Sequence, residues 1–221
     1  MITNPPASIS AAVLILTLLA VGSFDGINET FWWLALLDIN PLEFPGRSAV
    51  VKQTIIGLLI SVLLLVLIFA FCIGLGVSTA NNKGVQQVTF SRAFIFLSCS
   101  VLPIGVAYHF AHYLTAFMVN VQYAVAAATD PLQQGHDLLG LGKFYVTTGF
   151  FNSHDSVHII WLTQATAVVF GHILSVLMAH IIAEKLWKNS RQVILSQLPI
   201  SIFMVLYTLL GLWLLAAPRG A

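Results

Sequence analysis

The stretch IIGLLISVLLLVLIFAFCIGLGV, residues 55–77, contains no charged residue and no proline. An α-helix rises 1.5 Å per residue, so about 20 such residues cross the roughly 30 Å hydrocarbon core of a bilayer. The run is far longer than the alternating strands of about 9–11 residues that build membrane β-barrels. It therefore predicts a transmembrane helix.

The rest of the chain has the same character. Of its 221 residues, 58% are hydrophobic and only 8% are charged, and the mean hydropathy is +0.93. A soluble domain of this size needs more polar surface. The formal net charge of +1 and the lack of a basic run argue against nucleic acid as a partner. We expect a membrane protein whose main partner is the lipid bilayer.

Five apolar segments fit a crossing: 7–22, 50–78, 93–127, 158–184 and 193–217. The third would extend roughly 50 Å, so it must tilt, project or bend, and Pro103 is a candidate bend. The first has the length of a signal sequence but lacks a preceding Lys or Arg, and we expect it to remain as a span. The predicted fold is an all-α polytopic helix bundle that forms a single domain over residues 1–221.

Two long loops, 23–49 and 128–157, share one side of the membrane, and both contain aromatic and leucine-rich stretches. We expect these stretches to be interfacial segments, which either anchor the loops or fold back as a lid over the bundle. On the other side of the membrane, the basic residues lie in two short loops: Lys83, Arg92, Lys185, Lys188 and Arg191. The positive-inside rule then puts the N-terminus in the cytoplasm and the long loops outside, in a bacterial inner membrane.

Histidines lie inside two of the predicted spans. His112 is 15 residues before position 127, and His172 is 14 after 158, so both lie roughly 20 Å from the outer ends of their helices. His109 lies one turn deeper than His112 and about 60° round the helix. We therefore expect these imidazoles to converge at one level, whereas His180 near the inner end can pair with Glu184.

An ionisable side chain in hydrocarbon must find a partner and is by default a functional hypothesis. The plainest alternative is hydrogen bonding to Ser, Thr, Gln164 or backbone carbonyls in neighbouring helices. Neutral imidazole also suits zinc, copper and iron, so a divalent transition metal at His112 and His172, with His109 as a further ligand, is one functional interpretation. A b-type haem between His112 and His172, or a subunit that relays protons or metal ions, fits the same residues.

Acidic and cysteine residues near the spans add little. Asp25, in SFDG at the outer end of the first span, predicts either a turn or a carboxylate partner for a histidine. In NSHDSVH, His154 and His158 would lie one turn apart if the fourth helix begins early. Cys72 and Cys99 lie in apolar segments, where we expect small hydrophobes and no disulfide.

Several short motifs carry a resemblance to a known family. They are FDG (24–26), FAHYL (110–114), TDPL (129–132), GHILSVLMAH (171–180), QLP (197–199) and YTLLGLWLL (207–215). In this order and spacing the chain resembles bacterial polytopic membrane proteins known as fenitrothion hydrolases. His112, His172 and His180 match the pattern, whereas His109 stands where others can have an apolar residue.

The resemblance implies hydrolysis of a lipophilic phosphotriester by a metal-bound hydroxide. His112 and His172 would then be metal ligands and catalytic residues, with Asp25, His180 or a partner completing or orienting the shell. Larger proteins of this family have additional N-terminal spans, which implies a partner membrane protein that supplies further helices.

Overall fold

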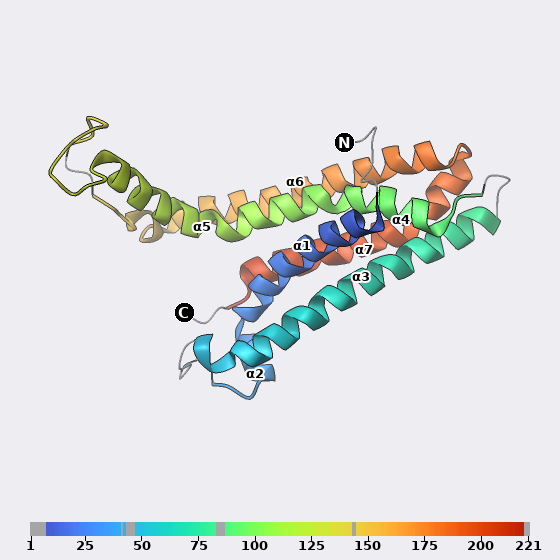
Figure 1. The fold of residues 1–221 in the computed structure, drawn as a ribbon, viewed down its shortest axis with the longest axis horizontal. Helices are drawn as coiled ribbons and strands as arrows, with labels where there is room; N and C mark the ends of the chain where they lie inside the picture. Colours follow the sequence, from blue (N-terminus) through green and yellow to red (C-terminus); the bar gives the residue numbers. More distant parts are fainter. Residues whose placement is uncertain (1–7, 41, 43–46, 83–86, 143–144, 219–221) are drawn as a thin grey trace.

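The computed structural model describes residues 8–40, 42, 47–82, 87–142 and 145–218 (Figure 1). In these residues every regular element is helical, which confirms the all-α prediction. The main helices are α1 (Ile9–Asn28), α3 (Val51–Asn82), α4 (Phe90–Ser98), α5 (Leu102–Thr129), α6 (His154–Leu186) and α7 (Ser190–Ala216). The short ones are α2 (Phe31–Leu36), η2 (Arg47–Val50), η3 (Cys99–Val101) and η4 (Gly149–Phe151).

The helices include five segments long and apolar enough to cross a membrane. They are Ile9–Asn28, Ser48–Asn82, Phe90–Thr129, His154–Leu186 and Ser190–Ala216. Each corresponds to one predicted span, and large apolar side chains are exposed along all of them. The protein is therefore a multi-pass membrane protein whose apolar helices suit contact with lipid.

The overlong third span is interrupted where Pro103 suggested a bend. The 3-10 turn η3 separates α4 from α5, and Pro103 stands in the first turn of α5. Proline is tolerated there because its missing N–H would have no acceptor within the helix. The next free amide, that of Ile104, donates to the hydroxyl of Ser175 in α6 at 3.2 Å, which ties the interruption to a neighbouring helix.

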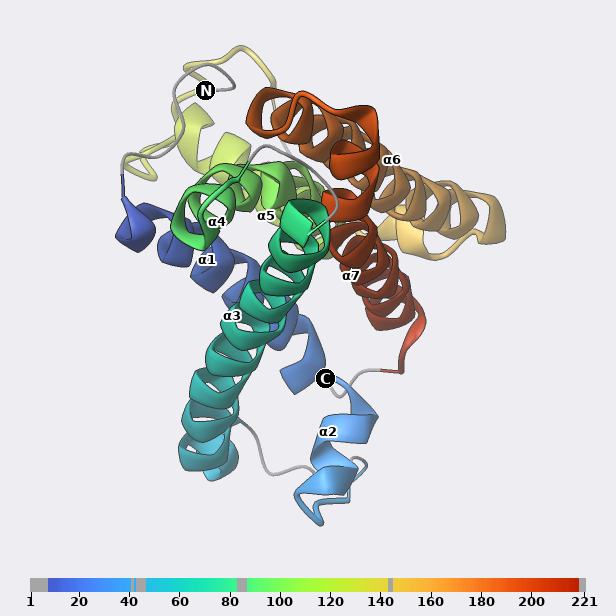
Figure 2. The ribbon, with the colours of Figure 1, turned by 90° about the vertical axis from the view of Figure 1, so that its right-hand side faces the viewer.

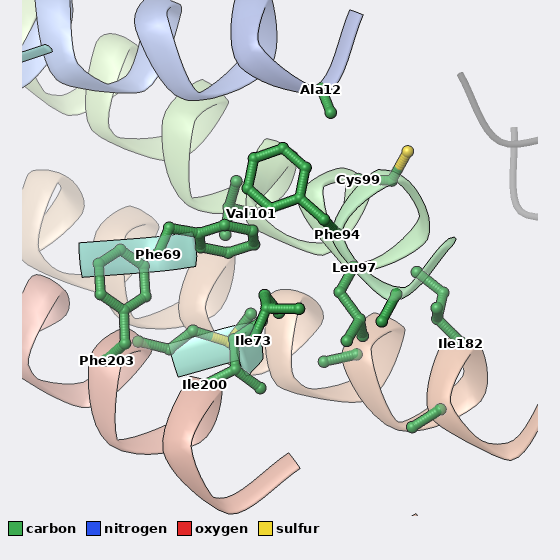
Figure 3. Close-up of a cluster of buried hydrophobic side chains, with 14 of the residues drawn as sticks. Ala12, Phe69, Ile73, Phe94, Leu97, Cys99, Val101, Ile182, Ile200 and Phe203 are labelled. Atoms are coloured by element: carbon green, nitrogen blue, oxygen red, sulfur yellow. The ribbon is translucent and has the colours of Figure 1, made fainter. Parts of the chain in front are cut away.

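The core lies where α1, α3, α4, α6 and α7 meet (Figure 3). Phe69 of α3 meets Phe94 of α4 and Phe203 of α7 edge to face, with ring centroids 5.7 Å apart in both pairs. At the C-terminal end of α3, the side chain of Asn81 bonds both backbone groups of Val88, and Trp187 donates to the side-chain oxygen of Asn81 at 3.4 Å. One amide thus ties the end of α3 to the start of α4 and the end of α6.

Helices α1 and α5 run parallel: His109 lies against Gly22 and His112 bonds Asp25, and in both pairs the residues are 87 positions apart. Helices α5 and α6 are antiparallel. They pack closely because Gly171 of α6 has no Cβ at the point where Ala107 and the Pro103 carbonyl of α5 approach it. The ends of α5 and α6 that adjoin the second long loop diverge from α1, α3 and α7 (Figures 1 and 2).

The two long loops behave differently. The aromatic stretch of the first loop forms the short helix α2, where Trp33 packs edge to face on Phe24 of α1 at 5.2 Å between centroids. The second loop lies at the far end of the α5–α6 pair, with most of its described residues exposed (Figure 1). Its described residues lie away from the bundle, so they do not form the lid over it (Figure 1). Lys83, one of the basic residues used for orientation, lies outside the described residues.

Candidate functional site

Asp25 is inside a helix and does not form a turn. Helix α1 continues three residues beyond it, to Asn28, so the predicted end of the first span was too early. The adjacent Gly26 leaves room for the ring of Tyr108 from α5, which keeps the two helices close beside Asp25. Of the two alternatives, the turn is wrong and the histidine partner is confirmed.

The carboxylate of Asp25 accepts two hydrogen bonds from α5. His112 donates from Nε2 to Oδ2 at 3.1 Å, and the Tyr113 hydroxyl donates to the same oxygen at 2.6 Å. The side chain of His112 is 4% exposed, and that of Asp25 is 33% exposed. We call these three residues the Asp25–His112–Tyr113 cluster.

Aromatic rings fix the imidazole of the cluster. Tyr108, one turn before His112 on α5, stacks on it with the ring planes 15° apart. Tyr113 meets the same imidazole edge-on, with centroids 4.7 Å apart. With the Nε2 proton directed at a carboxylate, a neutral His112 has its acceptor at the other ring nitrogen, so the pair can both hold and release a proton.

His109 does not join the cluster through a hydrogen bond. Its Nδ1–H donates to the carbonyl of Gly105 at 3.1 Å, and its ring lies against Gly22 of α1. It contacts Tyr113 only through a tilted ring pair with centroids 6.0 Å apart.

His172 faces a different helix from His112. Its Nδ1 lies 2.9 Å from the Thr208 hydroxyl of α7, and that hydroxyl donates to the carbonyl of Met204, so the imidazole is the donor to Thr208. Neighbouring contacts give the register: Gln164 bonds the carbonyl of Ala111, whereas Gly171 meets Ala107 and Pro103. His172 therefore lies about two turns, or roughly 10 Å, from the level of His112.

The prediction that His112 and His172 lie at equal depth was thus wrong. The reason lies at the loop end of the hairpin formed by α5 and α6. After the loop, the chain runs beside α5, where Gln122 exchanges two hydrogen bonds with the backbone of Thr147. Helix α6 begins only after that, at His154. The loop ends of α5 and α6 are not at the same level. Equal residue distances from those ends therefore do not place His112 and His172 at equal depth.

The remaining histidines pair locally. His180 has Glu184 at 3.4 Å and accepts from Gln197 at 3.0 Å, which confirms the predicted contact near the inner end. His154 and His158 stack one turn apart at the start of α6, capped by Ser153, so the early start of that helix is confirmed. His154 and the nearby Asp155 are more than nine-tenths exposed.

The described residues do not fit a metal held by this chain alone. Among them no group of three or more His, Cys, Asp or Glu side chains could hold a metal ion. The four predicted ligands His109, His112, His172 and His180 have separate partners: Gly105, Asp25, Thr208 and Glu184. His112 and His172 are also not opposed at one level, which bis-imidazole ligation of a haem requires.

The tyrosines of this region were missed by the sequence analysis. Tyr113 directly follows His112 in FAHYL, and a phenol in an apolar membrane-spanning segment needs a hydrogen-bond partner because hydrocarbon offers none. That signal was available, but its partner Asp25 is far away in the sequence. Ser23 and Tyr207 form a further hydrogen bond between α1 and α7, and these partners are also far apart in the sequence.

Fold and site together define a multi-pass helical membrane protein with a carboxylate–imidazole–phenol cluster between its first span and α5. The sequence and structure match no known family profile, no curated protein and no solved structure.

Proposed function

We propose that the protein is a subunit of a membrane-bound hydrolase for lipophilic phosphotriesters, with the Asp25–His112–Tyr113 cluster as its acid–base site. One observation carries the proposal: a single carboxylate oxygen receives both an imidazole N–H and a phenol O–H within membrane-spanning segments. Such groups are costly in a bilayer and are retained where they act.

The chemistry assigns a role to each member of the cluster. Water attacks phosphorus, the bond from phosphorus to the leaving oxygen breaks, and the proton of the water passes to the Asp25 carboxylate. The side chain of Asp25 is far more exposed than that of His112, so of these two it is the one that reaches water or substrate. His112 and Tyr113 orient the carboxylate, and the protonated Asp25 then gives its proton to the leaving oxygen.

The resemblance also implies a metal, for which the cluster offers the Asp25–His112 pair. Further ligands would have to come from the partner membrane protein that the same resemblance implies. No step of the scheme above passes through a metal.

The test is release of 4-nitrophenolate from diethyl 4-nitrophenyl phosphate by protein in its native membrane. We expect Asp25→Asn and His112→Gln to lower kcat/KM at least about 100-fold, as for loss of a general base. Asp155→Asn and His158→Gln are matched controls at exposed positions, and they should leave kcat/KM unchanged. Parent-like activity in Asp25→Asn, or no activity in the parent, would refute the proposal.

A proton relay is the second candidate, favoured by the chain of exchangeable groups that meets at one oxygen of Asp25. It predicts acidification of pyranine-loaded liposomes that Asp25→Asn abolishes, without ester hydrolysis. Measuring both activities on the same preparation separates the two functions.

We also propose a bacterial inner membrane as the location, with the N-terminus in the cytoplasm. The support is the basic character of the short loops. Fusions of alkaline phosphatase at residue 140 should be active and at residue 87 inactive; the reverse pattern would invert the topology.

A further inference from the structure

A cavity of about 380 Å³ lies between α1 and the start of α5, apart from the Asp25–His112–Tyr113 cluster. We call it the α1–α5 cavity. Its volume is within the range of about 300–1,000 Å³ that is typical of small-molecule sites. Its lining includes Ile15, Leu18 and Leu19 of α1 and Leu102, Val106 and His109 of α5. Among the described lining residues, His109 is the one with a polar side chain.

The protonation pattern of His109 follows from its hydrogen bond. A backbone carbonyl can only accept, so the contact between Nδ1 and the Gly105 carbonyl places the proton on Nδ1. In the neutral imidazole, Nε2 is then an acceptor. Among the described residues, no hydrogen bond reaches Nε2 of His109.

The imidazole is also held in place. It packs against Gly22 of α1, where a Cβ would collide with the ring, and its Nδ1–H is tied to its own helix. The cavity thus combines an apolar lining with one fixed acceptor, the arrangement by which small-molecule sites orient an apolar ligand.

We propose that the α1–α5 cavity binds a lipophilic molecule with a single hydroxyl group, such as an aromatic alcohol, whose O–H donates to Nε2 of His109. A lipid acyl chain would match the apolar lining but leave the acceptor without a donor. This inference does not depend on the proposed hydrolase function.

The experiment uses the full-length protein in nanodiscs, with tritiated 1-naphthol measured by scintillation proximity against empty nanodiscs. We expect saturable binding in excess of the empty discs. 1-Methoxynaphthalene has the same ring system without a donor, and it should bind about three- to tenfold more weakly, the value of one hydrogen bond.

Two variants locate the site. His109→Phe should reduce 1-naphthol binding to that of the methoxy compound and leave the latter unchanged. Gly105→Leu should abolish binding of both, because it fills the cavity; a Cβ at Gly105 meets Leu19 at an ordinary 3.5 Å. Phe110→Leu, on α5 outside the lining, is the matched control and should change neither.

Three results would overturn the proposal: no saturable binding above empty nanodiscs, equal affinity for the two naphthalenes, or unchanged discrimination in His109→Phe. Equal affinity would identify a lipid-chain groove instead. The comparison of the two ligands needs only the unaltered protein, so the test stands even if a variant fails to fold.

Discussion

The hydrogen bond between Asp25 and Tyr113 should be measurable as a coupling free energy. In membrane proteins, double-mutant cycles of such bonds average about 0.6 kcal/mol and reach about 1.7 kcal/mol. The bond is short, at 2.6 Å, and an ionised acceptor strengthens it, but both side chains are partly exposed. We therefore expect a coupling of about 1.5 kcal/mol, roughly tenfold in the unfolding constant.

The assay is unfolding by sodium dodecyl sulfate in mixed micelles, followed by tryptophan fluorescence, for the parent, Asp25→Ala, Tyr113→Phe and the double variant. A matched cycle at the exposed pair His154 and Asp155 should give a coupling near zero. A value below about 0.3 kcal/mol for Asp25 and Tyr113 would show that this bond does not stabilise the folded protein, and the argument for the cluster would lose its basis.

Three further predictions concern other parts of the molecule. Gly171→Ala should destabilise the protein by about 2 kcal/mol or more in thermal unfolding, because its Cβ meets α5, whereas Gly74→Ala, whose Cβ meets only one ring atom at 4.0 Å, should not. Hydrogen bonds from the amides of Gln134 and Gly135 lower the pKa of Asp130, because they stabilise its ionised form. These bonds should therefore order the loop fully above the ordinary pKa of 3.8, and the order should be lost as pH falls through the lowered pKa. Limited proteolysis should show that transition, and Asp130→Asn should remove it. Purified protein should show no Soret absorption band; such a band would revive the haem alternative.

The number of apolar spans and their helical type could be predicted, because hydropathy alone indicates where a chain can cross a bilayer. The segment 50–78 needed no other information, and it became α3 with four further residues at its C-terminal end. The ends were less predictable. Helix α1 passes through Asp25 because donors from α5 satisfy the carboxylate, and those donors are far away in the sequence.

The site was predictable in part. An aspartate at the end of a span and a histidine within another were both candidates, and the structure pairs them. The partner of His172 was not predictable, because it depends on the register of α5 against α6. That register is fixed by close packing at Gly171 and by the segment beside Gln122, and neither has a periodic signature.

The parallel packing of α1 and α5 brings both histidines of GVAYHFAHYL against the same helix, yet in different surroundings. Gly22 lies against His109, and three residues later Asp25 binds His112. One substitution can therefore test the surroundings of His109 separately from those of His112. Gly22→Ala should displace the His109 ring and weaken 1-naphthol binding, while the hydrogen bonds of Asp25 and any activity that depends on them persist. If Gly22→Ala instead abolished both, the two histidines would act as one site, and their division into an acid–base group and a ligand-binding group would be wrong.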